Sequence, residues 1–230
     1  MLDPTGRVAM VSGASRGIGR AIVERLLEAG FTVSAGVRDP RGLVDGDRLQ
    51  VCRYDAESLD SAQAWVKAAA DRWGRIDALV NAAGINTKAT ISDPDESALD
   101  ALWLVNVKAP LRLIRLAWPH LVASGTGRVI NVASLSGKRV ANENIGYAMT
   151  KHALVALTHR VRQEGFDSGI RATALCPGFV ATDMTAKANW PREKMSDPRS
   201  MAELALTALS LPNDVSVAEL LVNCRAEHTL

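Results

Sequence analysis

The sequence predicts an α/β fold in which a doubly wound parallel sheet is flanked by helices on both faces. The pattern of apolar residues along the chain predicts it. Short apolar runs rich in valine alternate along the chain with longer segments whose apolar residues recur at helical spacing. Strands that alternate with helices pair in parallel through right-handed crossovers. We therefore expect a single Rossmann-type domain over residues 1–230, with ligands bound at the carboxyl ends of its strands.

The predicted elements follow one another in a regular order. The first strand is the apolar run 7–12, which passes through a glycine turn into a helix that Gly30 ends. Further strands are expected at 31–37, 49–54, 76–81, 127–134, 171–176 and 218–224. Helices are expected at 58–74, at about 96–122 and around Tyr147. The polar stretch 178–197 has no strand pattern, and we expect either a lid over the site or a mobile surface loop there.

Composition excludes several classes of protein. Apolar residues make up 47% and charged residues 23% of the chain, as in an ordinary globular protein. The net charge of +2 comes from mixed signs without a basic run, so we expect no nucleic-acid or membrane partner. The start has no signal-peptide pattern and no apolar run is long enough to span a bilayer, so a cytoplasmic protein is expected. The three cysteines and four histidines lack metal-ligand spacing, so no metal is expected.

A glycine turn follows the first predicted strand. Gly13, Gly17 and Gly19 form the pattern G-x-x-x-G-x-G between that strand and the next helix. Glycine there lets a diphosphate approach the first helical N–H groups, where the helix dipole also favours negative charge. This spacing differs from the G-x-G-x-x-G fingerprint of dinucleotide-binding proteins, so the glycines alone are also compatible with a plain turn.

Tyr147 and Lys151 are one helical turn apart in the segment NIGYAMTKHAL. A pair at this spacing can be no more than two neighbours on one helix face. The functional alternative starts from acidity, because a free phenol has a pKa of about 10 and a nearby ammonium lowers that pKa. A tyrosine tuned in this way could exchange a proton with an alcohol or carbonyl oxygen as a general acid or base.

Several motifs occur together and in a particular order. They are SGASRGIG at the glycine turn, LVNAAG after the fourth strand, Asn106 in LVNVK, Ser134 thirteen residues before Tyr147, the Y-x-x-x-K of Tyr147 and Lys151, and PGFVATDM. With this ordered set the chain resembles the short-chain dehydrogenase/reductase family over nearly its whole length.

The resemblance implies a catalytic set of four residues. Tyr147 is similar to the family's acid/base, and Lys151 to the residue that lowers the tyrosine pKa and bonds the nicotinamide ribose. Ser134 matches the hydroxyl that holds the substrate oxygen, and Asn106 matches the asparagine that maintains a proton relay with the lysine and a water. Donors already aimed at a carbonyl oxygen stabilise the negative charge that grows there as hydride arrives at the carbon.

The resemblance also implies which residues contact a nicotinamide dinucleotide. They are Gly13, Ser15, Arg16, Gly17, Ile18, Gly19, Arg38, Asp55, Asn81, Gly84, Tyr147, Lys151, Pro177, Gly178, Val180 and Thr182. Asp55 would meet the adenine edge, although it could instead cap a turn. Asn81 and Gly84 would line the cofactor cleft. Val180 and Thr182 would contact the nicotinamide carboxamide, although Val180 could be ordinary core.

The end of the second strand bears on the choice of cofactor. NAD-selective proteins of this fold generally present a carboxylate there, whereas a basic residue accommodates the 2′-phosphate of NADP. This chain has Val37 followed by Arg38, and Arg16 lies in the glycine turn, so two guanidinium groups could hold that phosphate. Asp39 could pair with Arg38 or reach a ribose. NADP (NADPH) is therefore expected, with NAD as the alternative.

These inferences predict an NADP(H)-dependent oxidoreductase that interconverts a ketone or aldehyde and the corresponding alcohol. The alternatives are an NAD-linked alcohol or hydroxy-acid dehydrogenase and a non-catalytic NADP(H)-binding redox sensor. The substrate pocket would include Trp190 and Met184, which favours a partly apolar compound. A homodimer or homotetramer is the default expectation. Ser12 keeps the hydroxyl of the family's usual threonine, whereas Ala82 replaces a common asparagine and leaves the local hydrogen bonding open.

Overall fold

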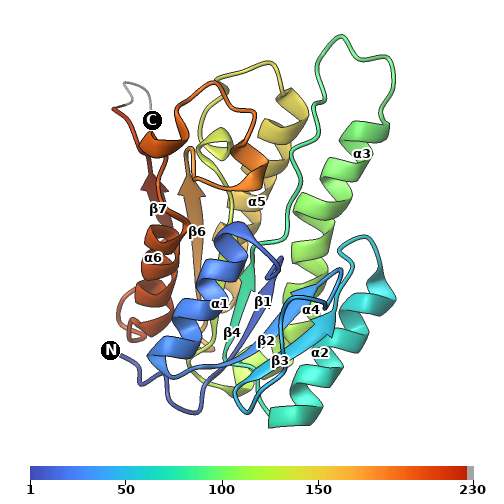
Figure 1. Cartoon of the computed structure of the whole chain (residues 1–230). Coiled ribbons are helices and arrows are strands. Elements are labelled where there is room, and N and C mark those ends of the chain that lie inside the picture. The colour runs from blue at the N-terminus through green and yellow to red at the C-terminus, as the bar shows by residue number, and fades with distance from the viewer. Residues whose placement is uncertain (227–230) are drawn as a thin grey trace.

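Seven parallel strands form one sheet in the computed structural model, which describes residues 1–226 (Figure 1). The strands span Val8–Ser12 (β1), Thr32–Val37 (β2), Leu49–Arg53 (β3), Ala78–Asn81 (β4), Arg128–Val132 (β5), Arg171–Pro177 (β6) and Glu219–Val222 (β7). Their order across the sheet is β3-β2-β1-β4-β5-β6-β7, and all neighbouring strands are parallel. The predicted α/β fold with a doubly wound parallel sheet is therefore confirmed.

Six α-helices accompany the strands within the described residues. They span Gly17–Ala29 (α1), Leu59–Trp73 (α2), Ser97–Trp103 (α3), Ala109–Ala123 (α4), Ile145–Glu164 (α5) and Pro198–Ser210 (α6). None of them, over residues 1–226, has both the length and the apolar character needed to cross a membrane.

Two of these helical regions differ from the sequence prediction. The helix expected at about 96–122 is divided, because a π-helical turn at Leu104–Lys108 joins α3 to α4. The prediction also lacked α6. Its start signals are nevertheless present in the sequence, since the Asp197 side chain accepts a hydrogen bond from the Arg199 N–H and Pro198 lies in the first turn.

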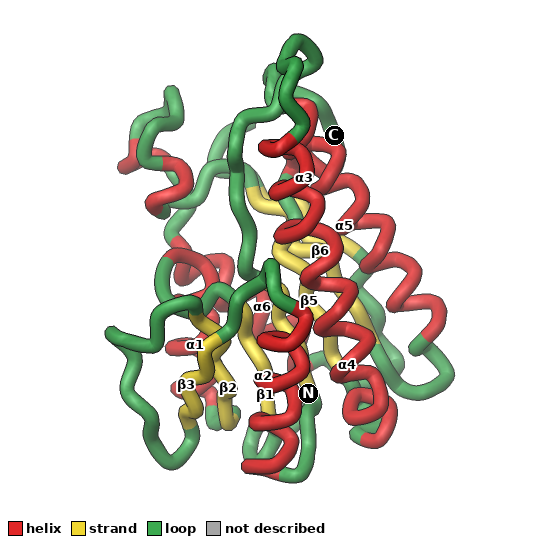
Figure 2. Tube along the Cα trace, turned by 90° about the vertical axis from the view of Figure 1, so that its right-hand side faces the viewer, coloured by secondary structure: helices red, strands yellow, loops and turns green. Residues whose placement is uncertain are grey.

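The helices cover the sheet in two layers (Figure 2). On one face α1 and α6 pack against each other, and Ile22 and Met201 are buried there with the strands. On the other face lie α2, α4 and α5, which bury Trp65 and Leu113. Burial of one large apolar side chain contributes roughly 1.5–3 kcal/mol. Trp65 packs directly on β2 at Gly36, where a Cβ would lie 2.6 Å from the indole ring.

The strand order reverses between β1 and β4, so a crevice is expected at the carboxyl ends of these two strands. The glycine turn follows β1 here, and the segment 82–84 follows β4. Gly13 has a φ of +67°, and a Cβ on it would lie 2.7 Å from the Ala83 nitrogen. Only glycine allows this conformation and this close approach together. The fold thus brings two of the sequence motifs side by side.

Candidate functional site

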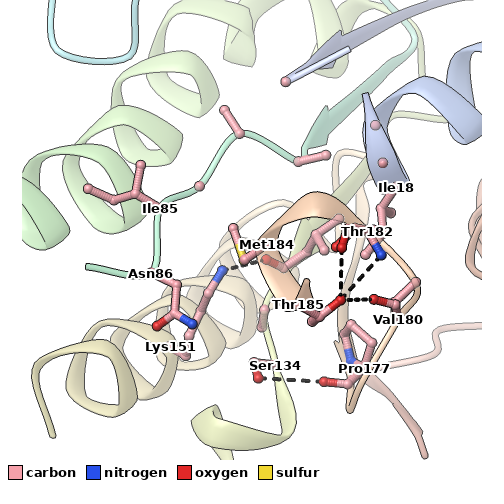
Figure 3. Close-up of a pocket in the computed structure, with 18 of the residues that line it drawn as sticks. Ile18, Ile85, Asn86, Ser134, Lys151, Pro177, Val180, Thr182, Met184 and Thr185 are labelled. Carbon is pink, nitrogen blue, oxygen red and sulfur yellow. Dashed lines mark hydrogen bonds between the residues drawn. The ribbon is translucent and has the colours of Figure 1, made fainter. Parts of the chain in front are cut away.

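A cavity of about 460 Å³ lies across the carboxyl ends of the strands, and most of the predicted site residues line it (Figure 3). The predicted residues that line it are Gly13, Ser15, Arg16, Gly17, Ile18, Gly19, Arg38, Asp55, Gly84, Ser134, Tyr147, Lys151, Pro177, Gly178, Val180 and Thr182. Two further predicted residues, Asn81 and Asn106, lie outside this lining.

The glycine turn forms one end of the cavity. α1 starts at Gly17, whose φ is +56°, and a Cβ on Gly19 would overlap the Gly13 carbonyl oxygen. The first-turn N–H groups of a helix carry the positive end of its dipole. A negatively charged group can therefore approach the main chain closely at this turn.

Ser12 braces this end of the cavity from the last position of β1. Its Oγ accepts hydrogen bonds from the N–H groups of Ala82 at 3.1 Å and Ala83 at 3.2 Å. The segment after β4 is therefore held through its main chain. Although Ala82 stands where an asparagine is common, both N–H groups here are satisfied by Ser12.

α5 presents Tyr147 and Lys151 to the cavity. Asn144 caps this helix, because its Oδ1 accepts a hydrogen bond from the Tyr147 N–H at 3.3 Å. The Lys151 ammonium donates to the Val132 carbonyl at 2.9 Å and lies 5.5 Å from the centre of the Tyr147 ring. Ser134, two residues after β5, lines the same part of the cavity, and its hydroxyl influences the acidity of Tyr147. Two hydroxyls and an ammonium thus meet at one wall of the cavity.

Burial governs the acidity of these groups. It raises the pKa of Tyr147 to about 12, while the nearby Ser134 hydroxyl acts in the opposite direction. Burial also lowers the pKa of Lys151 to about 8. The prediction of a lowered phenol pKa is wrong for this structure, because the loss of hydration around the phenolate outweighs the groups that favour it. Near neutral pH the pair consists of a protonated phenol beside an ammonium.

Asn106 lies in the π-helical turn between α3 and α4. Its Oδ1 accepts a hydrogen bond from the Ile85 N–H and its Nδ2 donates to the Ile85 carbonyl, both at 3.0 Å. Nδ2 also donates to Thr150 Oγ1 on α5 at 3.2 Å. These bonds fix the segment after β4 against α5, so they position one wall of the cavity. The proton relay predicted for Asn106 stays a prediction.

Asn81 does not line the cleft as predicted. It pairs in register with Asn131 of β5, so both side chains point to the same face of the sheet. Asn81 Nδ2 donates to Asn131 Oδ1 at 2.8 Å, and Asn131 Nδ2 donates to Thr158 Oγ1 of α5 at 2.8 Å. The side chain is 2% exposed and links the sheet to α5.

Asp55 caps a turn, as one of its two expectations had it, while its contact with an adenine edge stays a prediction. It lines the cavity beyond β3, and its carboxylate accepts a hydrogen bond from the Glu57 N–H at 3.0 Å in a local turn.

The residues expected to govern cofactor choice have distinct partners. Arg38 follows β2 and lines the cavity. Arg16 also lines it, but its guanidinium pairs with Asp183 at 3.0 Å, which directs it toward the loop rather than toward Arg38. Asp39 pairs with Arg41 at 2.6 Å and lies outside the cavity lining. The pairing of Asp39 with Arg38 considered above is therefore replaced by one with Arg41.

The segment 178–197 borders the cavity. It contains two short 3-10 turns, Asp183–Thr185 and Arg192–Lys194. Thr185 Oγ1 donates to the Val180 carbonyl at 2.5 Å and accepts from the Thr182 N–H at 3.2 Å (Figure 3). Val180 is 3% exposed and belongs to both the cavity lining and the core. The start of the segment is therefore a fixed part of the site.

Two residues of this segment were expected to line a substrate pocket. Met184 does line the cavity. The prediction for Trp190 is wrong, because Trp190 lies outside the lining and its ring stacks 5.3 Å from the Arg225 guanidinium.

The model of the family described as short chain dehydrogenase matches residues 7–193. The chain belongs to this family. Agropine synthesis reductase of Rhizobium rhizogenes is 41% identical over 227 residues, which make up 96% of this chain and 53% of that protein. An uncharacterized oxidoreductase of Staphylococcus saprophyticus is 32% identical, and the match covers 96% of this chain and 99% of the relative. The chain thus spans about half the length of the Rhizobium reductase and nearly all of the staphylococcal protein.

Two solved structures share the fold of this short-chain dehydrogenase. The 3-ketoacyl-(acyl-carrier-protein) reductase from Brucella melitensis, solved in complex with NADH, has a TM-score of 0.87 at 26% identity and matches 95% of this chain and 96% of its own. The aldohexose dehydrogenase of Thermoplasma acidophilum, in ligand-free form, has a TM-score of 0.88 at 23% identity and matches 99% of this chain and 98% of its own.

Several residues of this short-chain dehydrogenase site are absent from the sequence prediction. Asn144 also accepts a hydrogen bond from the Ala89 N–H at 3.0 Å, which ties the segment after β4 to α5. An asparagine at the position that begins a helix is a capping signal that could have found it. Arg139 and Arg225 line the cavity as well. Each follows the carboxyl end of a strand, where this fold places its ligands, and that rule could have found them.

Proposed function

We propose that this chain is an NADP(H)-dependent oxidoreductase that interconverts a ketone or aldehyde and the corresponding alcohol. One observation carries the proposal. The Tyr147 and Ser134 hydroxyls and the Lys151 ammonium meet at the wall of a cavity whose other end is the glycine turn. Proton transfer to a substrate oxygen needs the hydroxyls and the ammonium, and binding of a dinucleotide diphosphate needs the glycine turn. The names of the Rhizobium and Brucella relatives, both reductases, support the same class of reaction.

The lining residues fit a nicotinamide dinucleotide. The glycine turn leaves a cradle that side chains would fill, since a Cβ on Gly13 would lie 2.7 Å from the Ala83 nitrogen and one on Gly19 would overlap main chain. The start of α1 favours the negative charge of a diphosphate at this cradle. Ile18, Gly84 and Val180 would complete the binding surface. When bound there, the nicotinamide supplies or accepts the hydride.

Tyr147 holds the proton that reduction requires. With its pKa raised to about 12, the phenol is protonated near neutral pH and can donate to a substrate oxygen. Lys151, whose pKa is lowered to about 8, carries a positive charge there and stabilises the phenolate that proton donation leaves. The hydrogen bond from Ser134 Oγ to the Pro177 carbonyl is 3.5 Å long and weak, so this hydroxyl can turn to the substrate oxygen. Charge that develops on that oxygen then meets aligned donors.

Arg38 supports NADP over NAD. β2 ends in Val37, where NAD-selective proteins of this fold generally present a carboxylate. Asp39 is held by Arg41 at 2.6 Å. The Arg38 guanidinium lines the cavity beyond β2 and has the forked donors that suit a phosphate. Arg16 would contribute less, because it would first have to leave Asp183.

A fluorescence titration of the purified protein with NADPH and, in parallel, with NADH tests the cofactor. We expect NADPH to bind roughly tenfold more tightly, which is about 1.4 kcal/mol. Arg38→Gln should abolish this preference by weakening NADPH binding alone. Arg25→Gln, which removes the same charge from α1 outside the cavity lining, is the matched control.

Preferential NADH binding would overturn the choice of NADP. If neither dinucleotide binds, the oxidoreductase proposal itself is wrong. Consumption of NADPH with a panel of ketones and aldehydes then tests the reaction, and the redox-sensor alternative predicts binding without consumption for every compound.

A further inference from the structure

We propose that the substrate carries a carboxylate that Arg225 and Arg139 recognise, an inference that rests on the function proposed above. These two arginines line the same cavity as Ser134 and Tyr147. The arrangement of charges around the cavity, the order of the strands and the stacking of Arg225 support the inference.

The order of the strands divides the cavity into two halves. The glycine turn after β1 and Arg38 after β2 lie on one side of the reversal between β1 and β4. Ser134 after β5 and the segments after β6 and β7 lie on the other side. The Gly178 N–H donates to the carbonyl of Val222, the last residue of β7, at 2.7 Å, so these two segments leave the sheet side by side. Arg225 therefore reaches the cavity in the half that contains Ser134.

The two halves differ in charge. The carboxylates that line the cavity are Asp55, Glu57 and Asp183. Asp55 and Glu57 follow β3, and Asp183 is paired with Arg16 at 3.0 Å. Within the described residues, the charged side chains that line the half beyond β5, β6 and β7 are Lys151, Arg139, Arg225 and Asp183. Because three of these four are basic and the charge of Asp183 is met by Arg16, an anionic group on the substrate is favoured there and a cationic one is disfavoured.

Arg225 is positioned by aromatic rings. Its guanidinium carbon lies 5.7 Å from the centre of the Phe179 ring and 5.3 Å from that of Trp190. Such stacking uses the faces of the guanidinium and leaves its N–H edges to bind a planar oxyanion. A side chain held in this way loses less conformational entropy when it binds a ligand.

Arg139 approaches from the β5 side of the same half. It lies two residues beyond the 3-10 turn Leu135–Gly137 that follows Ser134, and its N–H donates to the Leu135 carbonyl at 3.1 Å. The main chain of Arg139 is thereby fixed relative to Ser134. A carboxylate, which is planar and singly charged, matches the forked donors of a guanidinium.

Matched pairs of carbonyl compounds test the inference. Aliphatic oxo acids of varied chain length and their methyl esters differ in charge but present the same ketone. With NADPH we expect the best oxo acid to exceed its ester in kcat/KM by about tenfold or more, as for a charge-assisted bidentate contact. Arg225→Gln should remove this advantage by raising KM for the acid while leaving the ester unchanged. Arg139→Gln should act in the same direction, and Arg225→Lys should retain part of the advantage.

Arg160→Gln is the control, because it removes one positive charge from an exposed pair with Glu164 on α5. It should leave the ratio between acid and ester as it is. Equal kcat/KM for acid and ester in the unmodified chain would overturn the inference but leave the oxidoreductase proposal standing. A preference for a phosphorylated ketone would have the same meaning. Equal losses of kcat/KM for acid and ester in Arg225→Gln would also overturn the inference, because Arg225 would then only hold the loop. Failure to reduce any carbonyl compound would instead overturn the proposed function.

Discussion

The two edges of the sheet use charge in opposite ways. At the carboxyl edge α1 and α5 begin, and the cavity lies there with its glycine turn, hydroxyls and Lys151. At the amino edge α4, α5 and α6 end, and the buried arginines Arg7, Arg128 and Arg171 donate to main-chain carbonyls at or just after these ends. The connecting helices run antiparallel to the strands, so their positive ends face the cavity and their negative ends face the arginines.

Arg128 shows that the amino edge is closed, in the sense that its charged side chains are buried and bonded within the protein. It is 1% exposed, and its guanidinium donates to the carbonyls of Gly169 at 3.2 Å and Leu211 at 2.6 Å and to Asn213 Oδ1 at 2.9 Å. Burial lowers its pKa to about 10, and it still carries a charge near neutral pH. Its partners are neutral oxygen atoms, and the helix ends supply the negative potential.

This difference separates function from stability. The three arginines at the amino edge are bonded mainly to main-chain carbonyls and so join the segments that follow three helices. At the carboxyl edge, main-chain N–H groups at the start of α1 and weakly held hydroxyls face a cavity, where a ligand can complete their bonding. Substitutions at one edge should therefore change activity with little effect on stability, and substitutions at the other should do the reverse.

The strongest test of this separation is Tyr147→Phe. If Tyr147 is the proton donor, turnover of a carbonyl substrate should fall by about a thousandfold, within the range for general acid–base groups. The free energy of unfolding should change by less than about 1 kcal/mol, because the ring stays and only a hydroxyl beside the cavity is lost. NADPH consumption and urea unfolding measure the two effects. Unchanged turnover would contradict the role of Tyr147 and break the comparison between the edges.

Arg128→Met probes the other edge. It removes the donor to the Gly169 and Leu211 carbonyls and to Asn213 Oδ1, and one of the two donors to the Gly127 carbonyl, and should lower the free energy of unfolding by about 3 kcal/mol. Dinucleotide affinity of the folded protein should not change. Arg160→Met, at an exposed pair, is the control and should cost less than about 0.5 kcal/mol. Arg128→Lys, which keeps the charge, gives a second measurement if the methionine variant does not fold. Equal stability of the Arg128 and Arg160 variants would refute a closed amino edge.

The smallest expected effect is the pH dependence of the free energy of unfolding that the buried Lys151 causes at the carboxyl edge. Its pKa is lowered from 10.5 to about 8 by burial, so the unfolded chain binds more protons than the folded chain between these values. The free energy of unfolding should therefore rise with pH through this window, by on the order of 2–3 kcal/mol. Tyr147 has a raised pKa and acts in the opposite direction, but only above pH 10.

Urea unfolding at pH 7.5 and 9.5, for the unmodified chain and for Lys151→Met, isolates this contribution. The variant should lose the part of the pH dependence that belongs to Lys151. Parallel pH profiles for the two proteins would show that Lys151 carries no such cost.

Much of the site could be predicted because its motifs are local. The glycine turn, the Tyr147–Lys151 spacing and the ends of the strands each lie within a few consecutive residues, and parallel pairing places all strand ends at one edge. α6 was missed although its start signals are present. Asn81 and Trp190 were misplaced, because strand register and the position of Arg225 determine what their side chains contact.

The sequence by itself determined the succession of the seven strands, the glycine turn and the placement of Ser134, Tyr147 and Lys151 at the carboxyl edge, since periodicity and spacing act within single elements. Only the tertiary structure decided the pKa directions of Tyr147 and Lys151 and the partner of Arg16. It also decided that Arg225 lies in the half of the cavity that contains Ser134. The physical reason is that burial and charge partners depend on distances between segments far apart in the chain.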